Sequence, residues 1–347
     1  MNLDIHTSNP IAEGAIDRTI PEYPPAADRE EHEYFESNPP PAYLSHLEGQ
    51  VAEFIRVHDG KRPIALVTSG GTTVPLENNT VRFIDNFSAG TRGATSTEHL
   101  LEQGYAVIFL HRQFSLLPYS RHYSHTTNCF LDYMVEGSDG KVTVDPKYQE
   151  EMLEVFQRYQ HAKTNKLLLL VPFTTVNQYL FTLRSISILL GKETTNNSTN
   201  VMFYLAAAVS DFFIPTSRRA NHKIQSDDVS AGGQLTVKLD PVPKFLRRLV
   251  ESWTPGAMIV SFKLETDPSI LEAKAKKALN RYNHQLVIGN LLQTRKREVI
   301  FVTQDGSVTT HQLTPEQEAS HVDVESIIIP NVISLHKKWI SSGGKHL

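Results

Sequence analysis

The sequence predicts an α/β fold: a Rossmann-like, doubly wound, mostly parallel sheet with helices on both faces. Short unbroken apolar runs recur along the 347-residue chain, and such runs are typical of strands buried on both faces. Helical stretches fall between many of these runs, as expected when helices connect parallel strands. With 40% hydrophobic and 21% charged residues, the chain has the composition of a globular protein that can bury a substantial core.

The expected elements follow one another along most of the chain. Strands are predicted at the apolar runs 64–67, 105–110, 166–171, 201–205, 257–261, 285–288 and 299–302. Helices are predicted at 43–57, 93–103, 148–163, 175–190, 243–252 and 268–282. The last helix has the clearest start, because Asp267 can cap it and Pro268 suits its first position.

Three segments lack this alternation. Residues 1–40 are rich in proline and acidic residues and poor in aliphatic ones, which predicts a flexible leader. The other two segments, near 112–147 and 216–243, are expected to be insertions in a single α/β domain formed by residues 41–340. The second insertion is expected to contain a hairpin around Gly232-Gly233.

Charge and hydropathy exclude several classes of protein. The 34 basic and 38 acidic residues give a net charge of −4, which argues against a nucleic-acid-binding protein. No secretory signal is visible, and the longest apolar run, 167–173, is far shorter than the ~20 residues of a membrane span. Cys129 is the only cysteine, so no intramolecular disulfide can form. We expect a soluble cytoplasmic protein, with the nucleus as the alternative.

Small and polar residues follow several of the predicted strands. The sequence Thr68-Ser69-Gly70-Gly71-Thr72 follows the first strand, Ala206-Ala207-Ala208 follows the fourth, and Phe262 and Asn290 follow two later ones. Ligands of open α/β sheets bind at the carboxyl ends of the strands. The residues at this edge therefore predict a site for a polar ligand with a flat ring.

A second glycine-rich loop precedes the helix at 93–103. It runs Asp85-Asn86-Phe87-Ser88-Ala89-Gly90-Thr91-Arg92-Gly93. Backbone N–H groups at a helix start, approached through glycines, are suited to binding phosphates. An ordinary tight turn would account for this loop equally well, but a second glycine turn at the same edge favours a nucleotide.

These motifs resemble the phosphopantothenate–cysteine ligases of the eukaryotic, stand-alone type. The resemblance rests on the two glycine loops above, with Val81-Arg82-Phe83-Ile84 leading into the second, and on three later motifs. The later motifs are Ala206-Ala207-Ala208-Val209-Ser210-Asp211-Phe212, His222-Lys223-Ile224-Gln225-Ser226 and Ser261-Phe262-Lys263-Leu264-Glu265-Thr266-Asp267. The resemblance spans about residues 40 to 335 and leaves no room for the decarboxylase domain that is fused to bacterial counterparts.

The resemblance implies a two-step reaction of coenzyme A biosynthesis. The carboxylate of 4′-phosphopantothenate attacks the α-phosphate of a nucleoside triphosphate and releases pyrophosphate. L-Cysteine then attacks the acyl nucleotidylate to give 4′-phosphopantothenoylcysteine and a nucleoside monophosphate. The resemblance further implies ATP as co-substrate, with CTP as the alternative, Mg²⁺, and a homodimer that uses one insertion for dimerisation.

Site residues are carried over from the same resemblance. Asn86 and Lys223 resemble the catalytic residues. The residues that resemble the family's nucleotide contacts are Gly70, Ser88, Gly90, Gly93, Phe262 and Asn290. Those that resemble its phosphopantothenate contacts are Asn86, Ala207, Ala208, Asp211 and, from the partner subunit, Arg82. One departure is Gly289, where a slightly larger residue is expected beside Asn290.

Alternative functions rest on weaker patterns. Tyr159 and Lys163 have the spacing of a short-chain dehydrogenase pair, which would make the chain an NAD(P)-binding oxidoreductase, although the matching glycine motif is absent. A non-catalytic scaffold or regulatory homologue is the other alternative, and the intact Asn86 and Lys223 argue against it. His111, His122 and His125 match no metal-binding spacing, so no protein metal site is expected.

Overall fold

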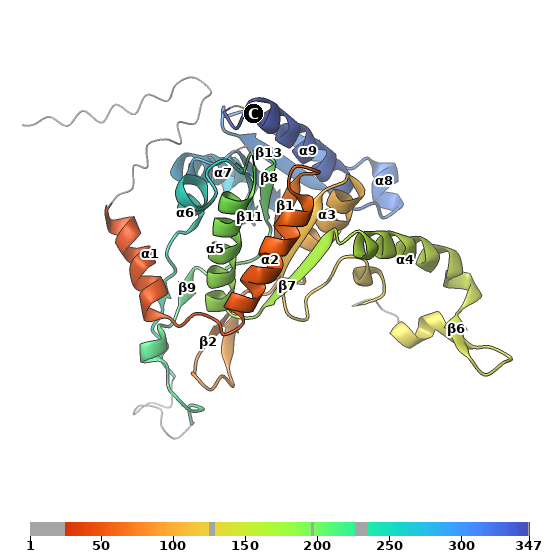
Figure 1. Ribbon diagram of the computed structural model, residues 1–347, viewed down its shortest axis with the longest axis horizontal. Helices are drawn as coiled ribbons and strands as arrows, with labels where there is room; N and C mark the ends of the chain where they lie inside the picture. The colour runs from red at the N-terminus through yellow and green to blue at the C-terminus, as the bar shows by residue number, and fades with distance from the viewer. Residues whose placement is uncertain (1–24, 125–128, 196–197, 226–234, 346) are drawn as a thin grey trace, which may run out of the picture.

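The fold is built on one eight-stranded sheet. The computed structural model describes residues 25–124, 129–195, 198–225, 235–345 and 347. The strand order is β14-β13-β12-β11-β8-β1-β4-β7 (Figure 1). The parallel strands are β1 (Ile64–Ser69), β4 (Ala106–Arg112), β7 (Leu168–Phe173), β8 (Val201–Leu205), β11 (Met258–Glu265) and β12 (Leu286–Leu291). Strands β13 (Glu298–Thr303) and β14 (Val308–Gln312) continue the sheet antiparallel.

Helices cover both faces of this sheet, so the predicted fold class is confirmed. Successive strand residues point to opposite faces: Leu66 of β1 belongs to one hydrophobic cluster and Val67 to the other. The first face carries α2 (Leu44–His58), α5 (Val176–Glu193), α6 (Leu246–Arg248) and α7 (Pro268–Tyr282). The second face carries α3 (Thr91–Glu102), α4 (Gln149–Thr164) and α9 (Glu325–Ser341).

The predicted elements are present with shifts of a few residues at their ends. The helix predicted at 243–252 is the exception, because α6 begins only at Leu246 and continues as a π-helix over Leu249–Trp253. Several elements had not been predicted, among them β14, the short α8 (Pro315–Ala319) and α9.

Residues 25–37 correct the expectation of a flexible leader. They form helix α1 (Pro25–Ser37), and Tyr34 of this helix is buried against Phe213 and Phe245. An aromatic side chain can supply enough buried apolar surface to order a short segment that is otherwise polar. Residues 1–24 lie outside the described residues.

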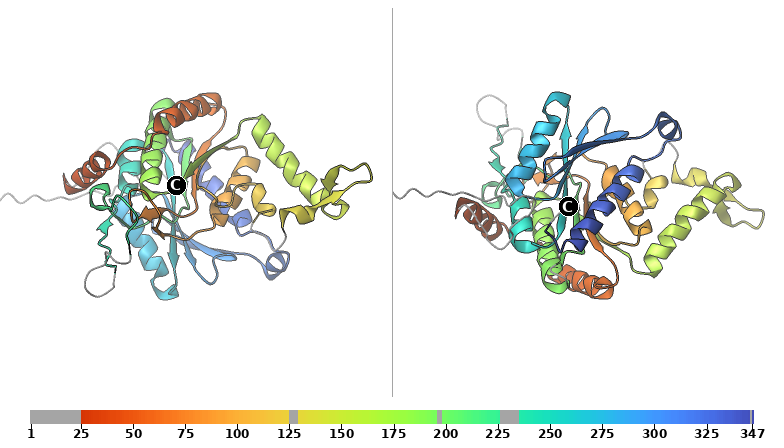
Figure 2. Two further views of the ribbon diagram at one scale, coloured as in Figure 1. Left: turned by 90° about the horizontal axis from the view of Figure 1, so that it is seen from below. Right: turned by 90° about the horizontal axis from the view of Figure 1, so that it is seen from above.

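Both predicted insertions leave the main sheet. The first contains a small hairpin, β5 (Met134–Glu136) and β6 (Val142–Val144), which projects from the body beyond α4 in all three views (Figures 1 and 2). The second contains β10 (Asp240–Pro241), which pairs with β9 (Phe212–Phe213) just before the insertion. The hairpin predicted around Gly232-Gly233 lies outside the described residues. A further hairpin joins β2 (Thr73–Pro75) to β3 (Phe83–Asp85).

One edge of the sheet is strand β7, which contains Pro172. The carbonyl groups of Leu167 and Phe173 accept hydrogen bonds from the β4 side of the sheet, at Val107 and Gln113. Because backbone groups alternate along a strand, the nitrogen of Pro172 faces away from β4, where its missing N–H costs no bond of the sheet.

The strand order reverses between β1 and β8. From β1 the chain proceeds outward to β4 and β7, and it then returns to place β8 on the other side of β1. Ligands of open α/β sheets bind at such a reversal, beyond the carboxyl ends of the two strands. Within the described residues, no helix has the length and apolar character of a membrane span.

Candidate active site

The first glycine turn and the alanine run lie side by side at the reversal. Beyond the end of β1, the carbonyl of Gly70 accepts a hydrogen bond from the amide of Ala208 (2.8 Å), and the amide of Thr72 donates to the carbonyl of Ala208 (3.0 Å). The amide of Ala207 donates to Thr68 Oγ1 (3.2 Å). The structure therefore brings Gly70, Ala207 and Ala208 together, as the sequence predicted.

Asn86 is held against the same turn. Its amide donates to the carbonyl of Thr72 (3.1 Å). Gly71 makes this approach possible, because a Cβ at that position would lie 1.6 Å from the carbonyl oxygen of Asn86. Backbone contacts thus place the half-buried Asn86 beside Gly71 and Thr72, which follow Gly70.

The start of helix α3 lies at the end of β1. Gly90 precedes the helix with φ +84°, and its carbonyl accepts a hydrogen bond from Ser69 Oγ (3.0 Å). A Cβ on Gly93 would lie 2.5 Å from the side chain of Ser69, so the helix contacts the strand directly. Ser88 Oγ accepts from the amide of Gly90 (3.4 Å). The first amides of a helix have no partner within it, so this end can bind an anion.

Phe262 and Asn290 lie on the same face of the sheet as α3. The ring of Phe262 packs edge-to-face on Tyr204 at 5.0 Å, and the guanidinium of Arg92 lies 5.8 Å from its centroid. Asn290, which is 7% exposed, stands on β12 opposite Leu264 of β11. The aromatic ring therefore lies beside Arg92 in the first turn of α3, and the amide of Asn290 lies on the same face of the sheet.

Arg92 was not predicted, and it ties α3 to α9. Its guanidinium donates to Glu325 Oε1 (2.7 Å) and to the carbonyl of Arg295 (2.6 Å). Burial raises the pKa of Glu325, and the adjacent Arg92 opposes this shift. The pair fixes the end of α3 that faces Phe262.

Packing explains why position 289 is glycine, where a slightly larger residue was expected. A Cβ on Gly289 would lie 2.8 Å from the side chain of Ile300 and 3.2 Å from that of Leu271. Both side chains crowd the position of a Cβ on one face of β12, so glycine allows β13 and α7 to pack closely there.

Asp211 is exposed, with Lys244 as its partner. Asp211 Oδ1 accepts a hydrogen bond from Lys244 Nζ (2.8 Å), and 73% of the Asp211 side chain is accessible. The carbonyl of Asp211 accepts from the amide of Val242 (2.8 Å). Lys244 was not predicted, because only the pairing of β9 with β10 brings it to Asp211.

Arg82 and Lys223 lie on adjacent segments. Arg82 Nη1 donates to Glu77 Oε1 and to the carbonyl of Ile224, both at 3.0 Å, so its guanidinium is bound within its own chain. The side chain of Lys223 is exposed. Glu77, which joins these segments, was not predicted.

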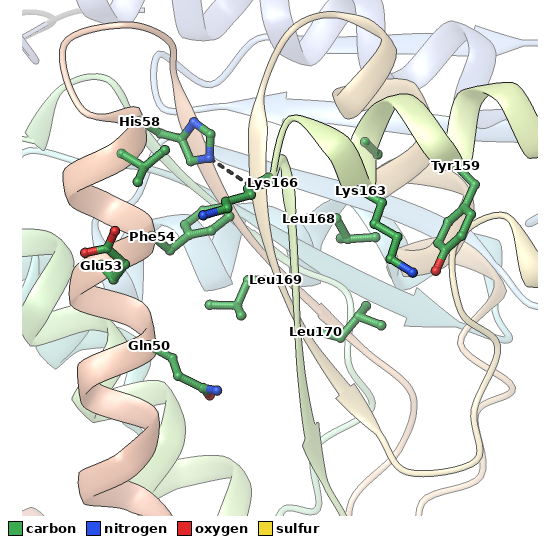
Figure 3. Close-up of a pocket in the computed structure, with 12 residues that line it drawn as sticks. Gln50, Glu53, Phe54, His58, Tyr159, Lys163, Lys166, Leu168, Leu169 and Leu170 are labelled. Carbon is green, nitrogen blue, oxygen red and sulfur yellow. Dashed lines mark hydrogen bonds between the residues drawn. The ribbon is translucent and has the colours of Figure 1, made fainter.

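A separate cavity lies away from these residues. Its volume is about 390 Å³, and it lies along the amino-terminal half of β7, between α2 and α4 (Figure 3). Tyr159 and Lys163 line it, with Lys163 Nζ 5.7 Å from the tyrosine ring. The pair that suggested a dehydrogenase is therefore remote from the glycine turns at the carboxyl end of the sheet.

The histidines considered as metal ligands have other contacts. His111 bonds to the carbonyl of Arg112 (2.9 Å), and His122 contacts Glu98 Oε2 (3.1 Å). His125 lies outside the described residues. Across those residues, no group of three or more His, Cys, Asp or Glu side chains is arranged to hold a metal ion.

Comparison with known proteins agrees with this geometry. The C-terminal domain family of DNA/pantothenate metabolism flavoproteins matches residues 184–328. The phosphopantothenate–cysteine ligase CAB2 of Saccharomyces cerevisiae is 52% identical over 97% of this chain and 94% of its own length. The phosphopantothenate–cysteine ligase of Homo sapiens is 42% identical over 80% of this chain and 88% of its own length.

A solved structure is similar over most of the chain. It is a histidine-to-alanine mutant of Cab2 in complex with phosphopantothenate-cysteine. The TM-score is 0.82 and the identity 54%, and the match covers 90% of this chain and 99% of the other.

The fold and these relatives together define an α/β enzyme. The chain belongs to the phosphopantothenate–cysteine ligase family. It is accordingly a ligase of coenzyme A biosynthesis, and neither the scaffold nor the oxidoreductase alternative gains support.

Proposed function

We propose that this chain joins 4′-phosphopantothenate to L-cysteine through an acyl nucleotidylate, with ATP as the nucleotide. The observation that carries the proposal is the position of Asn86 between the two glycine turns, beside the alanine run. A ligand carboxylate on the alanine side and a nucleotide phosphate at the start of α3 would meet there. CTP remains the alternative nucleotide.

The nucleotide would lie along the face of the sheet that carries α3. Its phosphates would approach Gly70, Ser88, Gly90 and the amide of Gly93, which lies in the first turn of α3 and has no partner within the helix. Its base would lie near Phe262 and its ribose near Asn290.

Phosphopantothenate would extend along Ala207 and Ala208 toward Asp211. Methyl side chains leave the backbone there open to a narrow substrate arm. The Asp211–Lys244 pair at the end of this path presents a carboxylate that can accept a hydrogen bond from the pantothenate hydroxyl or amide groups.

In the first step the carboxylate of phosphopantothenate, an anion, must approach the negatively charged triphosphate. Asn86 supplies a neutral amide donor that can hold the carboxylate and the acyl phosphate without adding negative charge. Lys223 supplies a positive charge for the departing pyrophosphate. Mg²⁺ would enter on the triphosphate, because this ion binds phosphates with few protein ligands, and the described residues form no ligand cluster of their own.

A homodimer would complete the site with Arg82 of the partner subunit. The β2–β3 hairpin that carries Arg82 also exposes apolar side chains: Val81 (56%), Phe83 (50%), Ile84 (39%) and Phe87 (86%). A patch of this kind is typical of an interaction surface. Part of the Arg82 side chain, 42%, remains accessible for a phosphate. We place the enzyme in the cytoplasm, with the nucleus as the alternative.

Asn86→Asp tests the proposal. The new charge would face an anionic intermediate, so pyrophosphate release on addition of phosphopantothenate should fall by roughly 10²- to 10³-fold while the fold is retained. Asn79→Asp is the matched control, since it adds the same charge at the exposed tip of the same hairpin and should change the rate little. A folded Asn86→Asp enzyme with a normal rate would refute the assignment.

A further inference from the structure

Glu77 is a buried carboxylate that belongs to none of the predicted motifs. It follows β2, and its side chain is fully covered. Oε2 accepts hydrogen bonds from the amides of Val81 (3.2 Å) and Arg82 (3.0 Å), and Oε1 accepts from Arg82 Nη1 (3.0 Å). The carboxylate thus holds the turn of the hairpin that leads to Asn86.

The same carboxylate reaches the segment that carries Lys223. Hydrogen bonds from the backbone of Arg82 and Val81, from the Arg82 side chain and from the backbone of Ile224 lower the pKa of Glu77. Arg82 Nη1 also donates to the carbonyl of Ile224 (3.0 Å). Ile224 directly follows Lys223, so both peptide groups of Ile224 are tied to the Glu77–Arg82 pair.

Further bonds align the two segments. Glu77 forms a bridge with Ala220, and the amide of Asn78 donates to the carbonyl of Ala220 (2.8 Å). The side chains of Asn78 and Asn221 are joined at 2.9 Å. The backbone on both sides of Lys223 is therefore attached to the hairpin, whereas the exposed Lys223 side chain makes no ion pair with any described residue.

We infer that Glu77 is a positioning residue for the ligation: it fixes the backbone of Lys223 relative to Asn86, so that the lysine side chain is presented to the triphosphate. The inference rests on the proposed role of Lys223. One buried group would thereby set the separation of the two residues that act on opposite sides of the reacting phosphate.

Glu77→Gln is the first test. The glutamine NH₂ group would face backbone and guanidinium donors that need an acceptor, so at least one attachment is lost. Pyrophosphate release should slow by roughly 5- to 100-fold with a smaller change in the KM for ATP. Glu77→Asp retains the charge and should recover part of the rate. If Glu77→Gln does not fold, Glu77→Asp replaces it as the test, and a folded Glu77→Asp enzyme with the wild-type rate would contradict the inference.

A double-mutant cycle separates positioning from a general loss of stability. If Glu77 acts through Lys223, Glu77→Gln combined with Lys223→Gln should be no slower than Lys223→Gln alone. Glu98→Gln is the matched control, because Glu98 is a buried carboxylate that also accepts from an arginine and a backbone amide, but on α3. Its effect should multiply with that of Lys223→Gln.

Limited trypsin digestion gives a readout independent of catalysis. Cleavage within residues 218–223 should be faster in Glu77→Gln than in the wild type, and unchanged in Glu98→Gln. A slow Lys223→Gln enzyme together with a normal Glu77→Gln enzyme overturns the inference and leaves the proposed function intact. If the wild-type chain releases no pyrophosphate on addition of ATP and phosphopantothenate, the proposed function itself is refuted.

Discussion

At the scale of single residues, glycine positions decide how closely the two loops of the site approach. Gly71→Ala would place a methyl group 1.6 Å from the carbonyl oxygen of Asn86. The hairpin must then shift, so we expect kcat/KM to fall by at least about tenfold, the equivalent of one to two kcal/mol of lost transition-state stabilisation.

Gly49 provides the control for this substitution. It lies within helix α2, and an added Cβ would meet nothing within 4 Å. Gly49→Ala should therefore raise the free energy of unfolding by about 0.5–1 kcal/mol and leave the activity unchanged. Wild-type kcat/KM in Gly71→Ala would show that Asn86 need not be held where the structure places it.

Residue patterns predicted the parts of the site that lie at strand ends. Gly70 and Ala208 could be placed together because the carboxyl ends of neighbouring strands share one edge, whereas Asn86 was assigned from the family resemblance. Glu77 and Lys244 could not, since each acts through a partner that only the folded chain brings near: 33 positions separate Lys244 from Asp211. Short motifs carry no information about such contacts.

At the scale of elements, helix α9 shows why one long helix was not predicted. Pro330 lies inside it, and proline removes a helical hydrogen bond. Burial of Ile328, Ile329 and Val332 in the core offsets that loss. Strand β14 was not predicted because it is short and polar and has no apolar run. Its pairing with β13 defines it as a strand.

The burial of α9 gives the protein a pH-dependent stability. His336 Nδ1 accepts a hydrogen bond from the Tyr105 hydroxyl (2.7 Å), and Nε2 donates to the carbonyl of Thr199 (3.1 Å). Burial lowers the pKa of His336 from 6.5 to about 4. Between these values the unfolded chain binds the proton and the folded chain does not, so stability decreases as the pH falls through this window.

Denaturant unfolding at pH 7 and pH 5 measures this effect. His336 alone should lower the free energy of unfolding by roughly 2 kcal/mol at pH 5. His336→Gln should be less stable at pH 7 but should lose less stability on acidification. His46→Gln removes an exposed histidine of α2 and should keep the wild-type pH dependence. An unchanged slope in His336→Gln would mean that His336 binds protons equally in the folded and unfolded chains.

At the scale of the whole molecule, two surfaces are candidates for the interface of the proposed homodimer. One is the apolar β2–β3 hairpin, and the other is the projecting insertion, where Leu131 is 71% exposed. Phe83→Asp should yield a monomer by sedimentation and raise the KM for phosphopantothenate, because Arg82 would no longer reach the partner's site. Leu131→Asp is the control and should remain dimeric; the reverse result would assign the interface to the insertion.

Pro172 affects whether the strand of another chain can pair with the edge strand β7. An edge strand offers a template on which another chain can extend the sheet, and such extension is the first step of aggregation. With Pro172 in place, the outer side of β7 lacks a donor near its end, so a neighbouring strand would leave one of its carbonyl groups unsatisfied. The protein can therefore carry a continuous apolar strand such as Leu168–Phe173 at its margin without inviting uncontrolled self-association.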